Sequence, residues 1–140
     1  MKRKASARWQ GDLKTGKGQI SSDSGVLDAT RYSFATRFED GKGTNPEELI
    51  AAAHAGCFSM ALSAVLGAAG LTPEWIDTQA AVQLDKVEGG FAITAVHLDV
   101  TAKVPGANAD SFAKAAADAK ANCPVSKVLR AEITMDARLA

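Results

Sequence analysis

The two cysteines are the side chains of this sequence best suited to chemistry, and they lie in different settings. Cys57 lies inside a long apolar stretch, residues 49–66, whereas Cys123 directly precedes Pro124. A thiol reacts as its thiolate, and burial among apolar side chains raises its pKa above the usual value of about 8.5. Cys57 therefore needs a cationic partner if it is to act as a nucleophile.

A cation for Cys57 has to come from another segment of the chain. Cys57 falls about three turns into its helix, where the helix dipole has already faded. Arg37 is the candidate, because a guanidinium stays charged and offers several donors to a thiolate or a substrate oxygen. Glu47 could orient that guanidinium through a bidentate pair. The residue types alone leave a plainer interpretation open: a core cysteine, a strand-edge arginine and a helix-start acid.

Cys123 has a local reason to be reactive. The residue before Pro124 can cap a helix, which would place the Cys123 sulfur near free backbone N–H groups and favour its thiolate. An ordinary buried cap fits the same pattern.

Two other chemistries would use the same residues. His54 and Cys57 lie three apart on one helical face and could supply half of a Cys2His2 zinc site. The remaining ligands would come from distant segments, and His97 falls on the polar side of its strand. A cysteine hydrolase pairing Cys57 with His54 lacks a well-placed orienting acid other than Glu47. We therefore expect no metal and no bound cofactor.

Length and charge restrict the class of protein. The chain has 140 residues, with 16 basic and 16 acidic side chains, so we expect one domain, residues 1–140, that binds neither nucleic acid nor a membrane. The basic start, residues 1–4, is not followed by an apolar segment and does not resemble a secretory signal. We expect a cytoplasmic protein, in which cysteines are more often catalytic, metal-binding or core residues than structural bridges.

Residues 1–45 have the pattern of a meander of short strands, with turns marked by glycine and aspartate. The segment 32–38 alternates aromatic with other residues, which predicts a strand with Arg37 on the face opposite the aromatics. A helix should then begin at Asn45, which can cap it, with Pro46 in the first turn and Glu48 completing a capping box.

The stretch 49–66 is apolar on all sides and nearly long enough to span a bilayer. It is rich in Ala and Gly, contains His54 and has no flanking aromatic belt, so a buried helix is the better interpretation. One small domain has difficulty covering such a helix. This predicts that a second subunit covers it.

The remainder predicts a hairpin turning at residues 88–90 with a bulge near Ala95, then a helix over residues 108–121. That helix should bury Phe112, Ala116 and Ala119. A short helix over residues 124–129 and a final strand over residues 131–138 complete an α+β fold with antiparallel sheet.

Three motifs carry a resemblance to a known family: Gly43-Thr44-Asn45-Pro46-Glu47-Glu48-Leu49-Ile50, Ala53-His54-Ala55-Gly56-Cys57-Phe58-Ser59-Met60-Ala61-Leu62 and Asn122-Cys123-Pro124-Val125-Ser126. Together with Trp9, the glycines of residues 16–18 and the Thr36-Arg37-Phe38 segment, they resemble the OsmC branch of the OsmC/Ohr peroxidases. The similarity covers essentially the whole chain in order.

The resemblance implies a cytosolic, thiol-dependent peroxidase that reduces organic hydroperoxides to alcohols. It implies that Cys57 attacks the peroxide and becomes a sulfenic acid, that Cys123 condenses with it to a disulfide, and that an external dithiol, of lipoyl type, reopens this bond. Arg37 and Glu47 match the family's arginine and glutamate. The implied fold is an intertwined homodimer whose sheets wrap two central helices. The alternative is a redox-sensing or ligand-binding dimer without efficient turnover.

Overall fold

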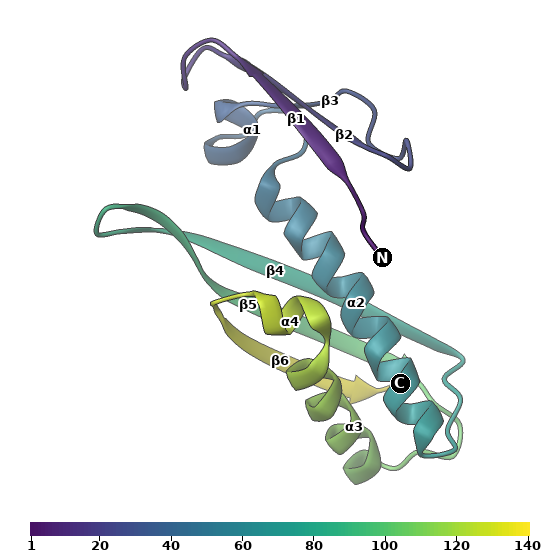
Figure 1. Cartoon of the computed structure of the whole chain (residues 1–140). Coiled ribbons are helices and arrows are strands. Elements are labelled where there is room, and N and C mark those ends of the chain that lie inside the picture. The colour runs from purple at the N-terminus through teal and green to yellow at the C-terminus, as the bar shows by residue number, and fades with distance from the viewer. The chain divides into compact units, whose positions relative to one another are not determined.

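The computed structural model describes all residues, 1–140. The chain folds into two compact units, Met1–Leu49 and Ile50–Ala140. Helix α2 (Pro46–Ala68) begins in the first unit and continues into the second. Figure 1 labels the elements of both units.

The N-terminal unit is built on a three-stranded antiparallel meander. Its strands β1 (Ala5–Gln10), β2 (Lys17–Ser22) and β3 (Thr30–Tyr32) pair in sequence order, as predicted. Gly18 pairs with Tyr32, and a Cβ at Gly18 would come within 2.3 Å of the tyrosine ring. The ring therefore lies over a position that only glycine can fill. The Trp9 ring is 5.6 Å away, so this sheet carries an aromatic pair.

The segment after β3 is helical, and the predicted strand over residues 32–38 is wrong beyond Tyr32. Helix α1 (Phe34–Phe38) begins with a capping box, in which the Ser33 hydroxyl accepts from the Thr36 N–H and the Thr36 hydroxyl accepts from the Ser33 N–H. These side chains satisfy backbone groups that a strand would have paired across the sheet. The Arg37 guanidinium consequently lies over the Phe38 ring, 5.3 Å from its centroid, and not opposite the aromatics.

Helix α2 begins as predicted. The Asn45 side chain accepts a hydrogen bond from the Glu48 N–H at 2.8 Å and donates to the Thr36 carbonyl at 3.0 Å, which ties the helix start to α1. The Glu48 carboxylate accepts from the Thr44 hydroxyl at 2.9 Å, one residue before the cap, and not from the Asn45 N–H, so only the Asn45 half of the predicted capping box forms. At the other end Gly70 has φ +77°, where glycine carries little strain, and ends the helix in a Schellman turn.

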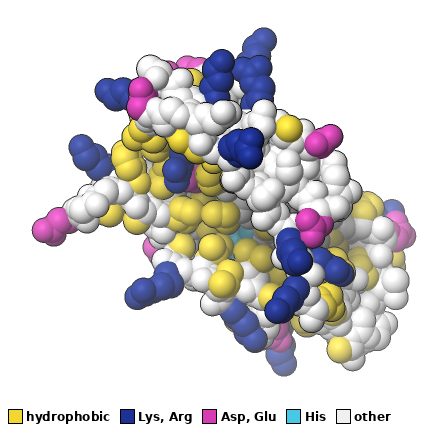
Figure 2. All heavy atoms as spheres, turned by 45° about the horizontal axis from the view of Figure 1, so that its top comes forward, with side chains coloured by type: hydrophobic (Ala, Val, Ile, Leu, Met, Phe, Trp, Pro, Cys, Tyr) yellow, Lys and Arg dark blue, Asp and Glu magenta, His cyan; other side chains and the backbone are white.

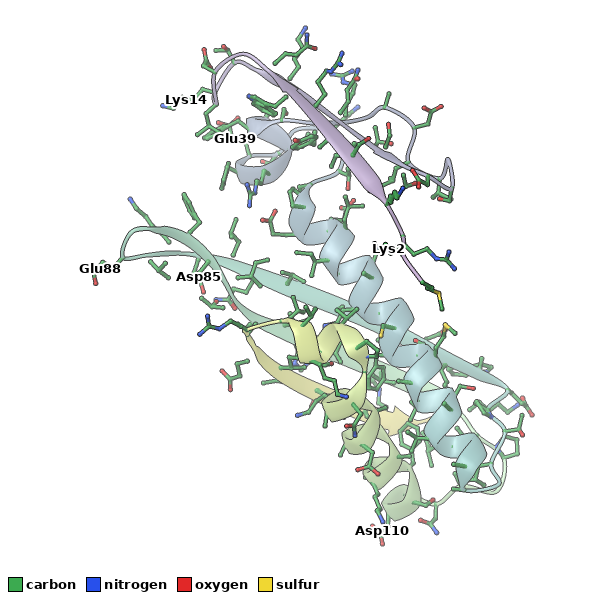
Figure 3. The ribbon with its side chains drawn as sticks, in the orientation of Figure 1. Lys2, Lys14, Glu39, Asp85, Glu88 and Asp110 are labelled. Carbon is green, nitrogen blue, oxygen red and sulfur yellow. The ribbon has the colours of Figure 1, made fainter.

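The C-terminal unit contains a long hairpin of β4 (Trp75–Val87) and β5 (Gly90–Lys103). Glu88 lies at its tip, in the turn that the sequence predicts (Figure 3). Gln83 pairs with Ala95 and Leu84 with Ile93, so Thr94 is the extra residue of a bulge beside Ala95. The predicted bulge is therefore confirmed.

The last strand, β6 (Glu132–Leu139), runs parallel to β5, which corrects the prediction of an antiparallel sheet. The connection between the two strands contains α3 (Ala109–Asn122) and α4 (Pro124–Val128). A connection of this length carries the chain back to the end at which β5 began, so the next strand runs in the same direction. The sheet is mixed, with strand order β4-β5-β6.

The core of the C-terminal unit lies between the sheet and its helices. The predicted stripe of α3 is confirmed, because Phe112, Ala116 and Ala119 are all buried. They pack with side chains from α2 and from the inner face of β5: Phe58, Leu62, Leu66, Val96, Leu98, Val100 and Ala102. This shared core packs α2 and the α3–α4 connection against the sheet.

Helix α2 buries only one stripe in the single chain. His54, Phe58, Leu62 and Leu66 recur every fourth residue and are fully buried, whereas Met60 is 77% exposed. By length and composition α2 could also cross a membrane, a property that core helices of soluble proteins share. Basic and acidic side chains are interspersed on the face shown in Figure 2, with hydrophobic ones exposed among them.

Candidate functional site

The two cysteines lie side by side in the C-terminal unit. Cys57 lies on α2, and Cys123 occupies the junction at which α3 ends and α4 begins. Their sulfur atoms are 2.9 Å apart, both thiols are free, and Cys123 is fully buried. Two thiols at this separation can share one proton and can be joined by oxidation with little movement.

The surroundings of the pair act differently on the two thiols. Burial raises the pKa of the Cys57 thiol, and the neighbouring Cys123 sulfur raises it further. Burial also works to raise the pKa of Cys123, but the hydrogen bond with Cys57 and those from the Ser126 and Val125 N–H groups outweigh it and lower that pKa. Because the sulfurs are 2.9 Å apart, a proton held by one thiol stabilises the thiolate of the other.

Cys123 occupies the N-cap position of α4, with Pro124 in the first turn, as the sequence predicts. Its side chain does not complete a regular capping hydrogen bond. The nearby N–H groups still favour its thiolate, because their dipoles point toward the sulfur.

A buried hydrogen bond lies beside the thiols. His54 Nε2 is 2.8 Å from the Ser126 hydroxyl oxygen, and the imidazole is fully buried. Burial lowers the pKa of His54, so the ring is neutral at neutral pH. The sequence drew attention to His54 only as a possible ligand or base and did not indicate Ser126. The one sequence signal for this contact was spacing, since His54 and Ser126 each lie three positions from a cysteine.

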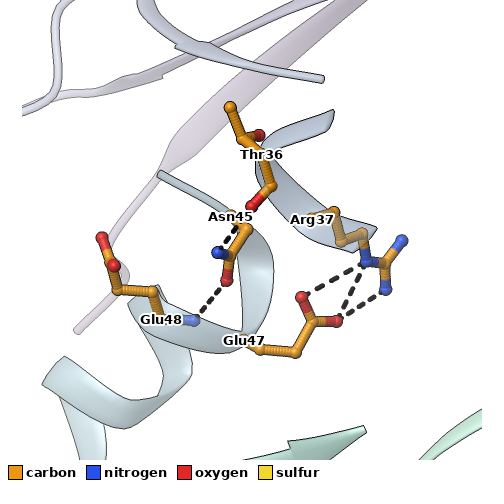
Figure 4. Close-up of polar contacts among 5 residues, drawn as sticks. All are labelled: Thr36, Arg37, Asn45, Glu47 and Glu48. Carbon is orange, nitrogen blue, oxygen red and sulfur yellow. Dashed lines mark hydrogen bonds and ion pairs between the residues drawn. The ribbon is translucent and has the colours of Figure 1, made fainter. Parts of the chain in front are cut away.

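Arg37 and Glu47 form an ion pair in the N-terminal unit (Figure 4). Arg37 Nη2 donates to the Glu47 carboxylate at 2.7 Å, and Nε donates to the same carboxylate at 3.0 Å. Glu47 is nearly buried, whereas the Arg37 side chain is 37% exposed. The predicted pairing of these two residues is therefore present. It holds the guanidinium in one orientation and leaves the Nη1 donors outside this pair.

An apolar pocket of about 240 Å³ adjoins the Arg37 side chain within the N-terminal unit. Aromatic and aliphatic side chains line it: Trp9, Leu13, Tyr32, Phe34 and Phe38. Such a lining suits an organic group whose polar end reaches a guanidinium.

Phe34, the first residue of α1, is one of the side chains that line this pocket. Phe58 is fully buried in the core of the C-terminal unit, and Met60 projects from α2. The helical period of α2 directs Phe58 into the core and Met60 away from it.

The other histidine has its own partners. His97 Nδ1 is 2.7 Å from the Thr134 hydroxyl, and Nε2 is 3.3 Å from the Asp136 carboxylate on β6. The chain gathers no set of three potential metal ligands. His97 thus takes part in cross-strand contacts on an exposed sheet face.

Residues 39–138 match the family model of the OsmC-like proteins. The chain belongs to the OsmC-like family. Peroxiredoxin OsmC of Escherichia coli is 59% identical over 137 residues, with 98% of this chain and 96% of the relative covered. The organic hydroperoxide resistance protein OhrB of Bacillus subtilis is 32% identical over 123 residues, covering 87% of this chain and 88% of the relative.

Solved OsmC-like structures have the same fold. The crystal structure of Bacillus subtilis OhrB aligns with a TM-score of 0.73 at 30% identity, covering 98% of each chain. A Legionella pneumophila structure named OsmC aligns with a TM-score of 0.68, covering 98% of this chain and 96% of that one. These matches confirm the predicted family, the α+β class and the predicted enzyme class, a cysteine-based peroxidase.

Proposed function

We propose that this protein reduces organic hydroperoxides to alcohols through a Cys57 sulfenic acid and a Cys57–Cys123 disulfide. The observation that carries the proposal is the 2.9 Å separation of the two sulfur atoms. The names of the relatives, a peroxiredoxin and organic hydroperoxide resistance proteins, support the choice of substrate.

In the first step the Cys57 thiolate attacks the terminal oxygen of the hydroperoxide, the one that carries the hydrogen. An S–O bond forms as the O–O bond breaks, and the alkoxide leaves with the electron pair and takes a proton to become the alcohol. Cys57 is then a sulfenic acid, oxidised by two electrons.

In the second step the Cys123 thiolate attacks the Cys57 sulfur. The S–S bond forms, the S–O bond breaks, and hydroxide leaves and is protonated to water. An external dithiol then reduces the disulfide by thiol exchange and is itself oxidised. A lipoyl-type dithiol is the reductant that we propose.

Arg37 and Glu47 complete the proposed site. Burial and Cys123 raise the pKa of Cys57, so its own unit does not favour the thiolate. A guanidinium at Cys57 would stabilise that thiolate and the departing oxygen, and Glu47 would keep the guanidinium oriented. We propose that Arg37 has this role and that the adjoining pocket accepts the organic group.

We also propose that the protein is a homodimer with α2 at its centre, each chain being a single domain in the cytoplasm. The support is the exposed side of α2, where small residues and Met60 leave an apolar surface on a helix that buries one stripe only. A second copy of the chain would cover this surface by packing its own α2 against it.

The test is a peroxidase assay with excess dithiol. Reduced protein is mixed with cumene hydroperoxide, and the alcohol product and the thiol consumed are measured for the wild type, Cys57→Ser and Cys123→Ser. We expect Cys57→Ser to be inactive. Cys123→Ser should react once and then accumulate over-oxidised Cys57, because no second thiol closes the disulfide.

The alternative, a redox sensor, needs only the two thiols. A sensor would oxidise once per equivalent of peroxide and turn over slowly even with excess dithiol. Activity of Cys57→Ser equal to that of the wild type would reject the enzyme mechanism. Stoichiometric oxidation without turnover would favour the sensor.

A further inference from the structure

A pocket of about 270 Å³ in the N-terminal unit is lined by three basic side chains and by no acidic one. Lys17 comes from β2, Arg31 from β3 and Lys42 from the loop between α1 and α2. The other residues of the lining are uncharged: Gly18, Gln19, Tyr32, Ser33 and Thr36. The proposed peroxidase mechanism uses none of the three cations.

The strand pairing gathers basic side chains on one face of the first sheet. Gln19 pairs with Arg8 on one side and with Arg31 on the other, so these three residues share a face. Lys17 shares it too, because it is two residues from Gln19 on the same strand. Strands β1, β2 and β3 contain no acidic residue. The sheet itself therefore offers no carboxylate to compensate the positive charge.

Two glycines place Lys42 beside this face. A Cβ at Gly41 would come within 2.8 Å of the Ala35 carbonyl carbon, and one at Gly43 would come within 3.0 Å of the Arg31 carbonyl oxygen. Gly43 also has φ +141°, a conformation that favours glycine. The loop thus packs against α1 and β3 more closely than a residue with a Cβ would allow. This close packing brings Lys42 to the pocket that Arg31 lines.

None of the three cations has an acidic partner. The ion pairs of the chain are made by other basic side chains: Arg37, His97, Lys103 and Arg138. Glu39 and Asp40 precede Lys42 in the chain but do not line the pocket. Like charges around one small pocket repel one another, and an anion among them would offset that repulsion. The pocket is therefore suited to a negatively charged ligand.

We propose that Lys17, Arg31 and Lys42 bind a small dianion of the phosphate class, either free phosphate or a phosphate monoester. The Arg31 guanidinium can donate to two phosphate oxygens at once, and each ammonium adds a point charge. A phosphate monoester carries about 1.5 to 2 negative charges at neutral pH and offers three strong acceptor oxygens, one for each cation.

The size and position of the pocket restrict this ligand. Its volume of about 270 Å³ is below the roughly 300–1,000 Å³ typical of pockets for drug-sized ligands, so the ligand is small. Lys17 and Arg31 lie on the sheet face opposite Trp9, which lines the apolar pocket beside Arg37. The anion site is therefore separate from the proposed substrate pocket, and it goes beyond the proposed peroxidase function.

The test is a titration of the reduced full-length protein at about pH 7.5 and low salt, followed by calorimetry and by the NMR shifts of backbone amides. The ligands are inorganic phosphate, glycerol 3-phosphate and lactate, which is a carboxylate monoanion. The variants are Arg31→Gln, Arg31→Lys and Lys42→Gln.

Two exposed basic residues outside the pocket supply matched controls, Arg8→Gln and Lys14→Gln. Arg8 shares the sheet face of Arg31, and Lys14 lies in the turn between β1 and β2 (Figure 3). Each control removes the same unit of charge as Arg31→Gln. Urea unfolding of every variant checks that the fold is kept.

The cations are exposed, so we expect the wild type to bind phosphate and glycerol 3-phosphate with a Kd on the order of 1 mM. Lactate should bind at least about tenfold more weakly. Amide shifts should concentrate in β2, β3 and the loop that carries Lys42. Tighter binding of glycerol 3-phosphate than of phosphate would identify a monoester as the ligand, and equal affinity would identify free phosphate.

Arg31→Gln should weaken phosphate binding about tenfold, because the bidentate contact is lost, and Lys42→Gln about threefold. Arg31→Lys should recover part of the affinity, since it keeps the charge and loses the fork. Arg8→Gln and Lys14→Gln should change the Kd by less than about twofold, because salt screens charges outside the pocket.

An equal loss in Arg8→Gln and Arg31→Gln would overturn the inference, since binding would then follow the surface charge and not the pocket. A wild type that binds no phosphate at millimolar concentrations, or that binds lactate equally well, would also overturn it. None of these outcomes depends on peroxidase activity, so the anion site and the proposed function are tested separately.

Discussion

Glu47 and Arg37 are joined by two nitrogens of the guanidinium, Nε and Nη2, which donate to one carboxylate at 3.0 and 2.7 Å. The carboxylate is almost buried and the guanidinium reaches solvent. The pair fixes an orientation, while exposure of Arg37 limits its contribution to the free energy of unfolding.

Replacing Glu47 should therefore affect activity more than stability. We expect Glu47→Gln to lower kcat/KM for cumene hydroperoxide by about 10- to 100-fold, because the guanidinium loses its fixed position. The free energy of unfolding should change by less than about 1 kcal/mol. Urea unfolding and initial rates measure the two effects. Glu48→Gln is the control, since Glu48 lies in the same helical turn but bonds Thr44; an equal loss in both variants contradicts the prediction.

The pocket beside Arg37 should select for bulky substrates. Leu13 lines it and is 64% exposed, so Leu13→Ala removes apolar contact without opening the core. We expect kcat/KM for cumene hydroperoxide to fall about three- to tenfold relative to that for hydrogen peroxide. Val26→Ala, at an exposed position of the same unit, is the control. An unchanged ratio of the two substrates would exclude this pocket.

His54 should make the protein less stable in mild acid. Burial lowers the pKa of His54 in the folded protein. As the pH falls, the imidazole is therefore protonated in the unfolded chain at a higher pH than in the folded protein. Stability is then fully present above the unfolded pKa of about 6.5 and decreases below it, by at most about 1.4 kcal/mol per pH unit. We expect His54→Gln to flatten the profile of urea unfolding between pH 7 and 5. His97→Gln is the control, and an identical slope for His54→Gln and the wild type would be inconsistent with this account.

The disulfide should stabilise the oxidised protein. Cys57 and Cys123 are 66 residues apart, and closing a loop of that length restricts the unfolded chain by about 4 kcal/mol in the chain-entropy model. This predicts a rise in Tm on the order of 10 °C on oxidation, measured by calorimetry with and without dithiol. Cys123→Ser should show no such rise in Tm. A rise in that variant would show that the disulfide is not its cause.

The exposed side of α2 should be the dimer contact. Met60→Lys would place a charge in the proposed interface, and we expect it to lower the light-scattering mass from two chains to one at micromolar concentration. Val128→Lys changes an equally exposed apolar residue on α4 and should leave the mass unchanged. A wild-type mass of one chain would reject the dimer outright.

Local sequence signals predicted most of the elements, and they failed where two signals competed. The alternation of aromatics over residues 32–38 indicated a strand, but the Ser33–Thr36 capping box takes the backbone into α1. The order of elements indicated a strand at the end of the chain and not its direction. The parallel pairing of β6 follows from a two-helix connection, which residue periodicity alone did not specify.

The sequence indicated the members of the proposed site but not their geometry. Family motifs indicated Cys57 and Cys123, and the charge argument indicated Arg37 with Glu47. The contact of His54 with Ser126 spans 72 residues, and no local pattern encodes a hydrogen bond between residues so distant. Such contacts arise only when α4 docks beside α2.

The parallel pairing of β6 with β5 also requires the long connection that carries Cys123. Residues 104–131 must leave the sheet, build α3 and α4, and return before β6 can pair. Cys123 is in that connection, whereas Cys57 precedes the hairpin. The two sulfurs therefore meet across 66 residues of chain, and their pairing requires α4 to be docked beside α2.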